Sequence, residues 1–419
     1  MPMTLAEKLI NMHSVREVRA GELTVVKVDF AYVQDWTGPL TVDRITELGV
    51  GLAKTPGRVA VFIDHASPSY VKEISTGHTK LRDYAKRSGC LIFDIGEGVS
   101  HLVLGEKVTA PGMLMVGADS HTCQGGALGA FATGMGSTDV GVAMATGETW
   151  MLVPETIRVN VTGRFQPGVY SKDAILYLIG QLGAAGATYM SLEFHGDTVE
   201  NMSIPARVTM ASMAVECGAK CGLFESDSHT LDWLKEHGHE WDYKEIKADP
   251  GANYKQLVGI DAAKLVPGVA FPHMVDNYRP ITHPECGTVS IQQAYLGSTT
   301  NGYFEDFEAA AKILKGRHTA PGTRLVITPG TKTVYRKLFQ SGISDIFLDA
   351  GGVISSPGCG ACPGGHGGIL GDGENCVASI NRNFKGRMGN PNSSVYLASP
   401  ATVAASAVEG RLADPRKYQ

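Results

Sequence analysis

The chain of 419 residues contains no apolar run that approaches the roughly 18 residues needed to span a membrane. Its N-terminus lacks the basic segment followed by an apolar one that marks a secretory signal. An excess of basic residues is also absent, since the formal net charge is -5, and this argues against nucleic-acid binding. The eight cysteines are scattered and do not form a short-range disulfide framework. We therefore expect a soluble protein of the cytoplasm with reduced thiols.

Glycine, by contrast, is abundant, with 51 residues against an average usage of about 7%. Short apolar runs, glycine-rich turns and helical segments alternate along the chain, which predicts an α/β protein with mainly parallel sheets. The pattern changes near Pro154, and residues 272–284 are typical of a linker. We expect three α/β domains that span residues 1–153, 154–280 and 281–419.

The first candidate site residues are Asp64 and His65, which directly follow the apolar run 59–63. In an open α/β sheet, ligands bind just beyond the carboxyl ends of the strands. The pair is therefore an acid/base candidate. An Asp-His pair also serves as a cap or as a packing feature, and this alternative stays open on the sequence alone.

A second strand-like run ends at Val116 and continues into a segment that places Asp119, Ser120 and His121 in succession. An acid, a hydroxyl and an imidazole at one strand end could all reach the same site. A turn with a helix N-cap is the competing interpretation, because Asp and Ser favour such positions. His101 lies a few residues beyond another strand-like run, 91–93.

The most distinctive motif is the segment 356–370, which places Cys359 and Cys362 in a Cys-x-x-Cys spacing. Its glycine and proline content predicts a loop and excludes a helix or a strand. Two thiols spaced in this way suit a metal ion or iron-sulfur cluster, a redox disulfide, or no chemistry at all. The spacing alone does not choose between these.

A second polar loop, residues 381–387, carries Arg382 and Arg387. Guanidinium groups are well shaped for bidentate binding of carboxylates. Arginines in loops are also commonly solvated without any further role. This motif alone therefore does not predict a binding site.

Taken together, these motifs resemble the large subunits of the aconitase superfamily, in the branch of 3-isopropylmalate dehydratase and homoaconitase. The resemblance covers nearly the whole length and keeps the motifs in order. The matching segments are 64–65, 117–122, 134–139, 359–362 and 381–387. It implies a three-domain α/β/α architecture from which the family's swivelling domain is absent.

The resemblance implies a hydro-lyase that removes water from a hydroxylated di- or tricarboxylic acid, such as 3-isopropylmalate or homocitrate. It implies a 4Fe-4S cluster held by three cysteines, with Cys359 and Cys362 as two of the metal ligands. The catalytic set that it implies is Asp64, His65, His101, Asp119, His121 and Glu193. The substrate-binding residues that it implies are Ser120, Arg382 and Arg387.

The family's catalytic serine has no counterpart in this chain, so the resemblance implies a small swivel-domain subunit as partner. That subunit would supply the serine and the loop that sets substrate specificity. The small hydroxy-acid substrate itself cannot be chosen from this sequence. Neither a membrane nor a nucleic acid is expected as a partner.

One position departs from the family. Its third cluster cysteine lies in a Gly-Ser-Cys-Thr-Asn motif, and here the motif contains Thr299 instead. A hydroxyl is a hard donor and a poor substitute for a thiolate on iron. Cys286 is the first candidate for a replacement ligand, and Cys376 and Cys123 are weaker ones.

Three explanations of Thr299 stay open besides a replacement ligand. The metal centre could be completed by the partner, a cofactor or a small ligand; the chain could have lost its cluster; or the threonine could have been introduced on purpose. The alternative functions that follow are a clusterless subunit that binds an anionic metabolite without turnover and, with less support, an RNA-binding regulator.

Overall fold

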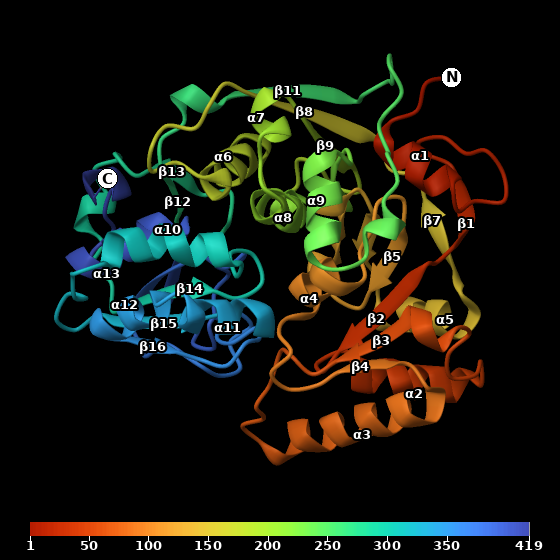
Figure 1. Ribbon diagram of the computed structural model, residues 1–419, viewed down its shortest axis with the longest axis horizontal. Coiled ribbons are helices and arrows are strands. Elements are labelled where there is room, and N and C mark those ends of the chain that lie inside the picture. The colour runs from red at the N-terminus through yellow and green to blue at the C-terminus, as the bar shows by residue number, and fades with distance from the viewer. Residues whose placement is uncertain (419) are drawn as a thin grey trace. The chain divides into compact units, whose positions relative to one another are not determined.

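The computed structural model describes residues 1–418, which form two compact units (Figure 1). The first unit comprises Met1–Ile95, Val103–Val161 and Ala187–Gly259. The second comprises Gly96–Leu102, Thr162–Gly186 and the chain from Ile260 onward. Among the described residues, no helix is long and apolar enough to cross a membrane.

The first unit is built on a five-stranded sheet in which every neighbouring pair is parallel. The strand order is β4-β3-β2-β5-β6. The strands are β2 (Phe30–Gln34), β3 (Val59–Phe62), β4 (Leu91–Phe93), β5 (Leu114–Gly117) and β6 (Phe131–Gly134). The chain proceeds from β2 outward to β4 and then returns to β5 on the other side of β2. The sheet therefore changes winding direction at β2, where α/β sheets bind ligands.

Both faces of this sheet are buried, which is why its strands are continuously apolar. Val59 and Val61 of β3 join one hydrophobic cluster, and Ala60 and Phe62 join the other. Successive side chains of a strand point to opposite faces, so the two clusters alternate along β3. The helices of this region are α1 (Leu5–Asn11), α2 (Gly38–Leu48), α3 (Lys72–Ser88) and α5 (Ser137–Thr146), and α4 (Ser100–Lys107) belongs to it from Val103 onward.

The remainder of the first unit carries two further sheets. An antiparallel ribbon pairs β1 (Leu23–Lys27) with β7 (Glu148–Leu152). A four-stranded sheet has the order β10-β9-β8-β11. Its strands are β8 (Thr156–Thr162), β9 (Ser191–His195), β10 (Cys221–Phe224) and β11 (Gln256–Asp261). The associated helices are α7 (Asp197–Glu200), α8 (Ile204–Met213) and α9 (Ser228–Glu236).

The second unit contains a seven-stranded sheet of order β13-β12-β18-β17-β14-β15-β16. The five strands from β18 to β16 are parallel, and β12 and β13 add an antiparallel edge. The strands are β12 (Gly268–Ala270), β13 (Tyr278–Pro280), β14 (Gln293–Gly297), β15 (Arg324–Thr328), β16 (Gly352–Ile354), β17 (Asn375–Ala378) and β18 (Ser394–Ala398). The helices are α6 (Ser171–Leu182), α10 (Phe304–Leu314), α11 (Lys332–Gln340), α12 (Ile343–Asp349) and α13 (Pro400–Glu409).

In this second sheet the winding direction changes at β14, because β15 and β16 lie on one side of it and β17 and β18 on the other. The expected α/β class with mainly parallel sheets is confirmed by the two large sheets. The division into three domains at residues 153/154 and 280/281 stays a prediction.

Candidate active site

The carboxylate of Asp35, directly after β2, organises the strand ends of the first unit. It accepts hydrogen bonds from the backbone N–H groups of His65 at 2.8 Å and Ala66 at 3.0 Å. A third bond comes from Nε2 of His78 at 2.9 Å. The Asp35 side chain is completely buried. Burial would raise the pKa of this carboxyl, but the His78 bond and the neighbouring His65 hold it below its ordinary value.

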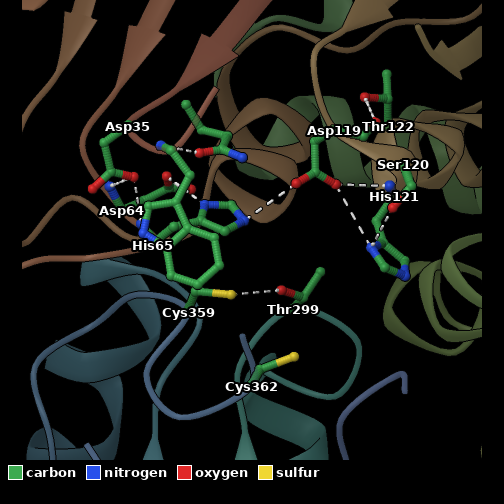
Figure 2. Close-up of polar contacts among 12 residues, drawn as sticks. Asp35, Asp64, His65, Asp119, Ser120, His121, Thr122, Thr299, Cys359 and Cys362 are labelled. Carbon is green, nitrogen blue, oxygen red and sulfur yellow. Dashed lines mark hydrogen bonds and ion pairs between the residues drawn. The ribbon is translucent and has the colours of Figure 1, made fainter. Parts of the chain in front are cut away.

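The segment that Asp35 fixes presents His65 between two carboxylates (Figure 2). Nδ1 of His65 lies 2.8 Å from Oδ1 of Asp64, and Nε2 lies 3.2 Å from Oδ2 of Asp119. The imidazole and the Asp64 carboxylate are both buried. A histidine that contacts a carboxylate through each ring nitrogen is held in one orientation and can pass a proton from one side to the other.

The series of contacts continues beyond Asp119. Nδ1 of His121 lies 3.6 Å from Oδ1 of Asp119, and its Nε2 lies 2.8 Å from Oε1 of Glu216. Five side chains, Asp64, His65, Asp119, His121 and Glu216, therefore form one continuous polar chain within the first unit. We call these five residues the acid/base chain.

Local backbone structure explains why Asp119 holds its place. Asp119 is the N-cap of a 3-10 helix, Ser120–Leu128, and its carboxylate accepts the N–H of His121 at 2.8 Å. The neighbouring strand approaches so closely that a Cβ atom at Gly134 would collide with the carbonyl oxygen of Asp119. The capping role is confirmed, and it leaves the same carboxylate in contact with His65, so the cap does not exclude the predicted catalytic role.

A pocket of about 460 Å³ opens beside Asp119 and Ser120. Trp150, Tyr189 and Lys220 contribute to its wall, as does the glycine-rich segment that leads into α5. Nζ of Lys220 donates to the carbonyl of Gly134 at 3.3 Å, and burial lowers the pKa of this amine. The pocket is large enough for a small acid, and it places a cationic group near the acid/base chain.

In the second unit, both thiols of the Cys-x-x-Cys loop are buried. Sγ of Cys359 lies 3.6 Å from Oγ1 of Thr299 and 3.8 Å from Oγ of Ser298 (Figure 2). Sγ of Cys362 lies 3.2 Å from Nη2 of Arg387 and 3.1 Å from Oδ1 of Asn381. The structure therefore brings together, within one unit, three motifs: Thr299 lies 60 positions before Cys359, and Arg387 lies 25 positions after Cys362.

Tyr295 on β14 fixes the backbone of the thiol loop. Its hydroxyl donates to Oγ1 of Thr328 at 2.7 Å and accepts the N–H of Ala361 at 3.1 Å. Gly360 has φ +59°, and a Cβ atom there would collide with the Tyr295 hydroxyl. Glycine is required at this position on both grounds. The loop has no helix or strand between residues 356 and 370, as the sequence predicts.

The backbone that presents Thr299 is equally constrained. Ser298 adopts φ +68°, an uncommon conformation for a residue other than glycine. Its hydroxyl donates to the carbonyl of Cys359 at 2.7 Å, and its N–H donates to that of Thr328 at 2.8 Å. The Thr299 side chain is 2% exposed and faces Cys359, so its hydroxyl occupies the direction from which a third ligand would approach.

The loop of residues 381–387, which we call the arginine loop, is held in place by a lysine that was not among the predicted site residues. Nζ of Lys172, on α6, donates to the carbonyls of Ser379 at 2.8 Å and Ile380 at 2.7 Å, directly before Asn381. Lys172 is fully buried. Arg382 stacks its guanidinium 5.5 Å from the ring centre of Phe384. Arg387 is the loop arginine that contacts a thiol.

Glu193 is not brought into the acid/base chain. It is fully buried on β9, where its carboxylate accepts the N–H of Leu5 at 2.8 Å and bonds His195 and Tyr254, both at 2.7 Å. Glu216 is the glutamate that contacts His121, and the expected catalytic role of Glu193 stays a prediction. His101 is a buried residue at the start of α4, in the second unit, and its expected role stays a prediction.

The candidate replacement cysteines do not meet the two thiols. Cys286 follows β13 and donates to the carbonyl of Pro280 at 3.6 Å. Three strands separate β13 from β14, the strand that precedes Thr299. Cys376 lies on β17 and contacts Val377 and Gln293. Cys123 belongs to the first unit, where it contacts Ser212.

Asp35 and Glu216 were not predicted from the sequence, and only Asp35 carries a sequence signal that could have identified it. Asp35 directly follows a continuously apolar strand, so the strand-end rule that selected Asp64 would have selected it too. Glu216 lies in a short 3-10 helix, Ala214–Cys217, and has no motif of its own. Only its contact with His121 marks it.

The family model of the Aconitase family (aconitate hydratase) matches residues 7–410. The chain is 51% identical over 417 residues to the 3-isopropylmalate dehydratase large subunit of Elusimicrobium minutum, and this covers 100% of the chain and 99% of the relative. It is 49% identical over 418 residues to the 3-isopropylmalate dehydratase large subunit 1 of Thermotoga maritima, with both proteins covered completely. The large subunit 2 of Archaeoglobus fulgidus is 48% identical over 418 residues, again over 100% of both.

Proposed function

The chain belongs to the aconitase family, and we propose that it is the large subunit of a hydro-lyase that dehydrates a hydroxylated di- or tricarboxylic acid such as 3-isopropylmalate. The observation that carries the proposal is the continuous acid/base chain from Asp64 to Glu216. The names of the relatives, which match over their full length, support the same reaction and substrate class.

In this reaction a C–H bond and a C–O bond break on adjacent carbons, and the hydroxyl leaves as water. The poor leaving group needs a proton, and His65 is the donor in our proposal. Asp64 on Nδ1 keeps the imidazole oriented and stabilises its protonated form, so that Nε2 faces Asp119 and the reacting hydroxyl. Asp119 and His121 complete the path along which the proton is replaced. His101 joins this acid/base set by family resemblance.

Recognition of the substrate carboxylates falls to Ser120, Arg382 and Arg387. Ser120 lines the pocket beside Asp119. The two arginines lie on the loop that Lys172 anchors, and guanidinium groups match the geometry of carboxylates. Arg387 would then serve two partners, a substrate carboxylate and the sulfur of Cys362.

Members of the aconitase family carry an iron-sulfur cluster, and in our proposal the metal centre of this chain lies at Cys359 and Cys362. Such a centre supplies a Lewis acid that polarises the leaving hydroxyl. The donor set fits only in part. Two thiols are in place, but a threonine hydroxyl occupies the third position, 3.6 Å from Cys359. A cluster held by three protein thiolates does not fit these residues, so no step of the reaction is derived through it.

The partner in this proposal is a small swivel-domain subunit. The relatives are named large subunits, which implies a second chain in those enzymes. By resemblance the small subunit supplies the serine that removes the C–H proton and a loop that selects the substrate. The proposed active site is therefore complete only in the heteromer.

The test is a hydration and dehydration assay of this chain co-expressed with its small subunit, on a panel of 2- and 3-hydroxy di- and tricarboxylates. We expect turnover of 3-isopropylmalate or a close analogue, and loss of turnover in the His65→Asn variant. The Asp43→Asn variant is a matched control, because that carboxylate pairs with Lys80 on the surface of the same unit. Absence of turnover on the whole panel by a metal-loaded heteromer would refute the proposal.

Thr299 favours one second candidate, a clusterless subunit that binds an anionic metabolite without turnover. A binding experiment distinguishes the two candidate functions. The second candidate predicts that hydroxy acids stabilise the heteromer against heat while no product forms and no metal is retained. Retention of metal by Cys359 and Cys362 would contradict it.

A further inference from the structure

We propose that Lys220 binds a carboxylate of the hydroxy-acid substrate in the pocket of about 460 Å³ that it lines together with Asp119 and Ser120. The inference deepens the proposed function and rests on it for the identity of the ligand. Lys220 directly precedes β10 and belongs to none of the predicted motifs. Its charge, its surroundings and its place in the pocket wall carry the inference.

The first argument is that the Lys220 ammonium lacks a carboxylate partner in the protein. Its Nζ donates to the carbonyl oxygen of Gly134 at 3.3 Å and lies 5.2 Å from the ring centre of Tyr189. Within residues 1–418, no carboxylate forms an ion pair with it. Burial lowers the pKa of this amine, because a carbonyl dipole and a ring compensate its charge only in part. A bound carboxylate would supply the opposite charge.

The second argument concerns Asp139, an acidic residue of the same pocket wall whose charge acts on Lys220 from beyond ion-pair distance. Oδ1 of Asp139 accepts the indole N–H of Trp150 at 3.3 Å. Asp139 also lies in the first turn of α5, where no side chain caps the helix. The positive end of a helix dipole stabilises a carboxylate in that turn. Asp139 therefore has partners of its own and leaves the ammonium to a ligand.

The third argument is the backbone that sets the wall beside Lys220. Tyr189 adopts φ +60°, an uncommon conformation for a residue other than glycine. Its N–H donates to the carbonyl of Gly218 at 3.1 Å, and a Cβ atom at Gly218 would collide with Thr188. This close packing holds the Tyr189 ring in the pocket wall beside the ammonium. Backbone strain of this kind is typically retained where it positions a functional group.

The pocket then joins a carboxylate-binding group to the acid/base chain. Oδ2 of Asp119 lies 3.2 Å from Nε2 of His65, and Asp119 and Lys220 line one cavity. A substrate with one carboxylate on Lys220 would present its hydroxylated carbon to Asp119. An ammonium is a compact point charge without the fixed fork of a guanidinium, so Lys220 would contribute affinity more than orientation.

The test is equilibrium binding of isopropylsuccinate, which lacks the reacting hydroxyl of 3-isopropylmalate, to the heteromer. We expect Lys220→Met to weaken binding by about 10- to 100-fold, because a charged hydrogen bond is lost, and Lys220→Arg to restore most of it. Lys235→Met is the matched control, since Lys235 pairs with Asp232 at the surface of the same unit. Unchanged affinity in Lys220→Met, or no binding by the native heteromer, overturns the inference.

A second arm separates direct contact from a structural role of Lys220. The monocarboxylates 4-methylpentanoate and 2,3-dimethylbutanoate each lack one of the two carboxylates of isopropylsuccinate. One of them should bind the native and Lys220→Met heteromers equally, because it lacks the carboxylate that Lys220 contacts. An equal loss of affinity for all three ligands overturns the inference. If Lys220→Met fails to fold, as judged by circular dichroism, Lys220→Gln takes its place in both arms.

The two proposals can fail separately. Turnover of 3-isopropylmalate with a KM that Lys220→Met leaves unchanged would refute this inference and leave the proposed function intact. Binding of isopropylsuccinate that depends on Lys220, in a heteromer without turnover of any hydroxy acid, would refute the proposed function and leave the carboxylate site intact.

Discussion

The two large sheets of this protein share one strand order but differ in what their strand ends present. In the first unit the parallel strands run β4-β3-β2-β5-β6, and in the second they run β16-β15-β14-β17-β18. In each, the first strand of the series lies at the centre, where the winding direction changes. The loops after the first, second and fourth strands carry Asp35 and the acid/base chain apart from Glu216 in one sheet. The loops after the first, third and fourth strands carry the thiol site in the other.

The difference lies in how complete each set is. Every member of the acid/base chain touches its neighbour, and Asp35 supports the chain from beneath. The thiol site contains the sulfurs of Cys359 and Cys362 and the guanidinium of Arg387. Its third position, where the family resemblance predicts a cysteine, holds the hydroxyl of Thr299. In the proposed function, the proton-transfer residues are all in mutual contact, whereas the proposed metal site has a hydroxyl at its third position.

The largest expected effect comes from breaking the acid/base chain at its centre. Replacing His65 with Asn removes the group that contacts both Asp64 and Asp119, and we expect turnover of the heteromer to fall by about 10²- to 10⁴-fold. Steady-state kinetics of the heteromer measure this loss. Turnover within a factor of two of the native enzyme would remove His65 from the mechanism.

The next largest effect is expected at Asp35, which accepts hydrogen bonds from the backbone of His65 and Ala66. In Asp35→Asn the amide nitrogen would face donors that now meet a carboxylate, and we expect a loss of about 3 kcal/mol in the free energy of unfolding. Denaturant titration followed by circular dichroism measures this. Asp43→Asn, which removes only a surface ion pair, should lose little.

Asp35 also predicts a pH dependence. Its folded pKa is held below 3.8, its value when unperturbed, by the His78 bond and the His65 charge, against the opposing effect of burial. The ionised carboxylate therefore contributes stability above pH 4, and this contribution is lost as the pH falls through the folded pKa. The native protein should approach the stability of Asp35→Asn in strong acid. A constant difference between the two at every pH would contradict this account.

A smaller effect is expected at Arg387, whose guanidinium contacts the sulfur of Cys362. Arg387→Lys keeps the charge but loses the planar fork, and we expect KM to rise about tenfold with a smaller change in kcat. The matched control is Arg324→Lys, whose guanidinium pairs with Glu374 at the surface of the same unit. An unchanged KM in Arg387→Lys would leave Arg387 as a partner of Cys362 alone.

The last prediction compares kinetics and stability after substitution of Glu216 and of Glu193. Glu216→Gln can still bond Nε2 of His121 but loses the charge, so we expect a decrease of about tenfold in kcat and a shifted pH-rate profile. Glu193→Gln should lower stability and leave that profile unchanged, because its partners are Leu5, His195 and Tyr254. The opposite result would restore Glu193 to the acid/base set.

Much of this could be predicted from local sequence. Apolar runs followed by polar residues located the ends of β3 and β5, and the glycine content of residues 356–370 predicted a loop. Those signals are local because strand burial and backbone freedom are properties of a few neighbouring residues. Glu216 shows the limit: no local pattern distinguishes it from Glu193, 23 positions earlier, and only the fold decides that Glu216 faces His121.

The sequence by itself determined the fold class, the family resemblance and the fact that Thr299 stands where the family has a cysteine. Only the tertiary structure decided that His65 lies between two carboxylates, that Lys172 anchors the loop 381–387, and that Cys286 contacts Pro280 at the end of β13. The physical reason is that strand order sets these distances. Neighbours in a sheet can be far apart in the chain, as β14 and β17 are, while β13 and β14, which follow each other along the chain, are separated by three other strands of the sheet.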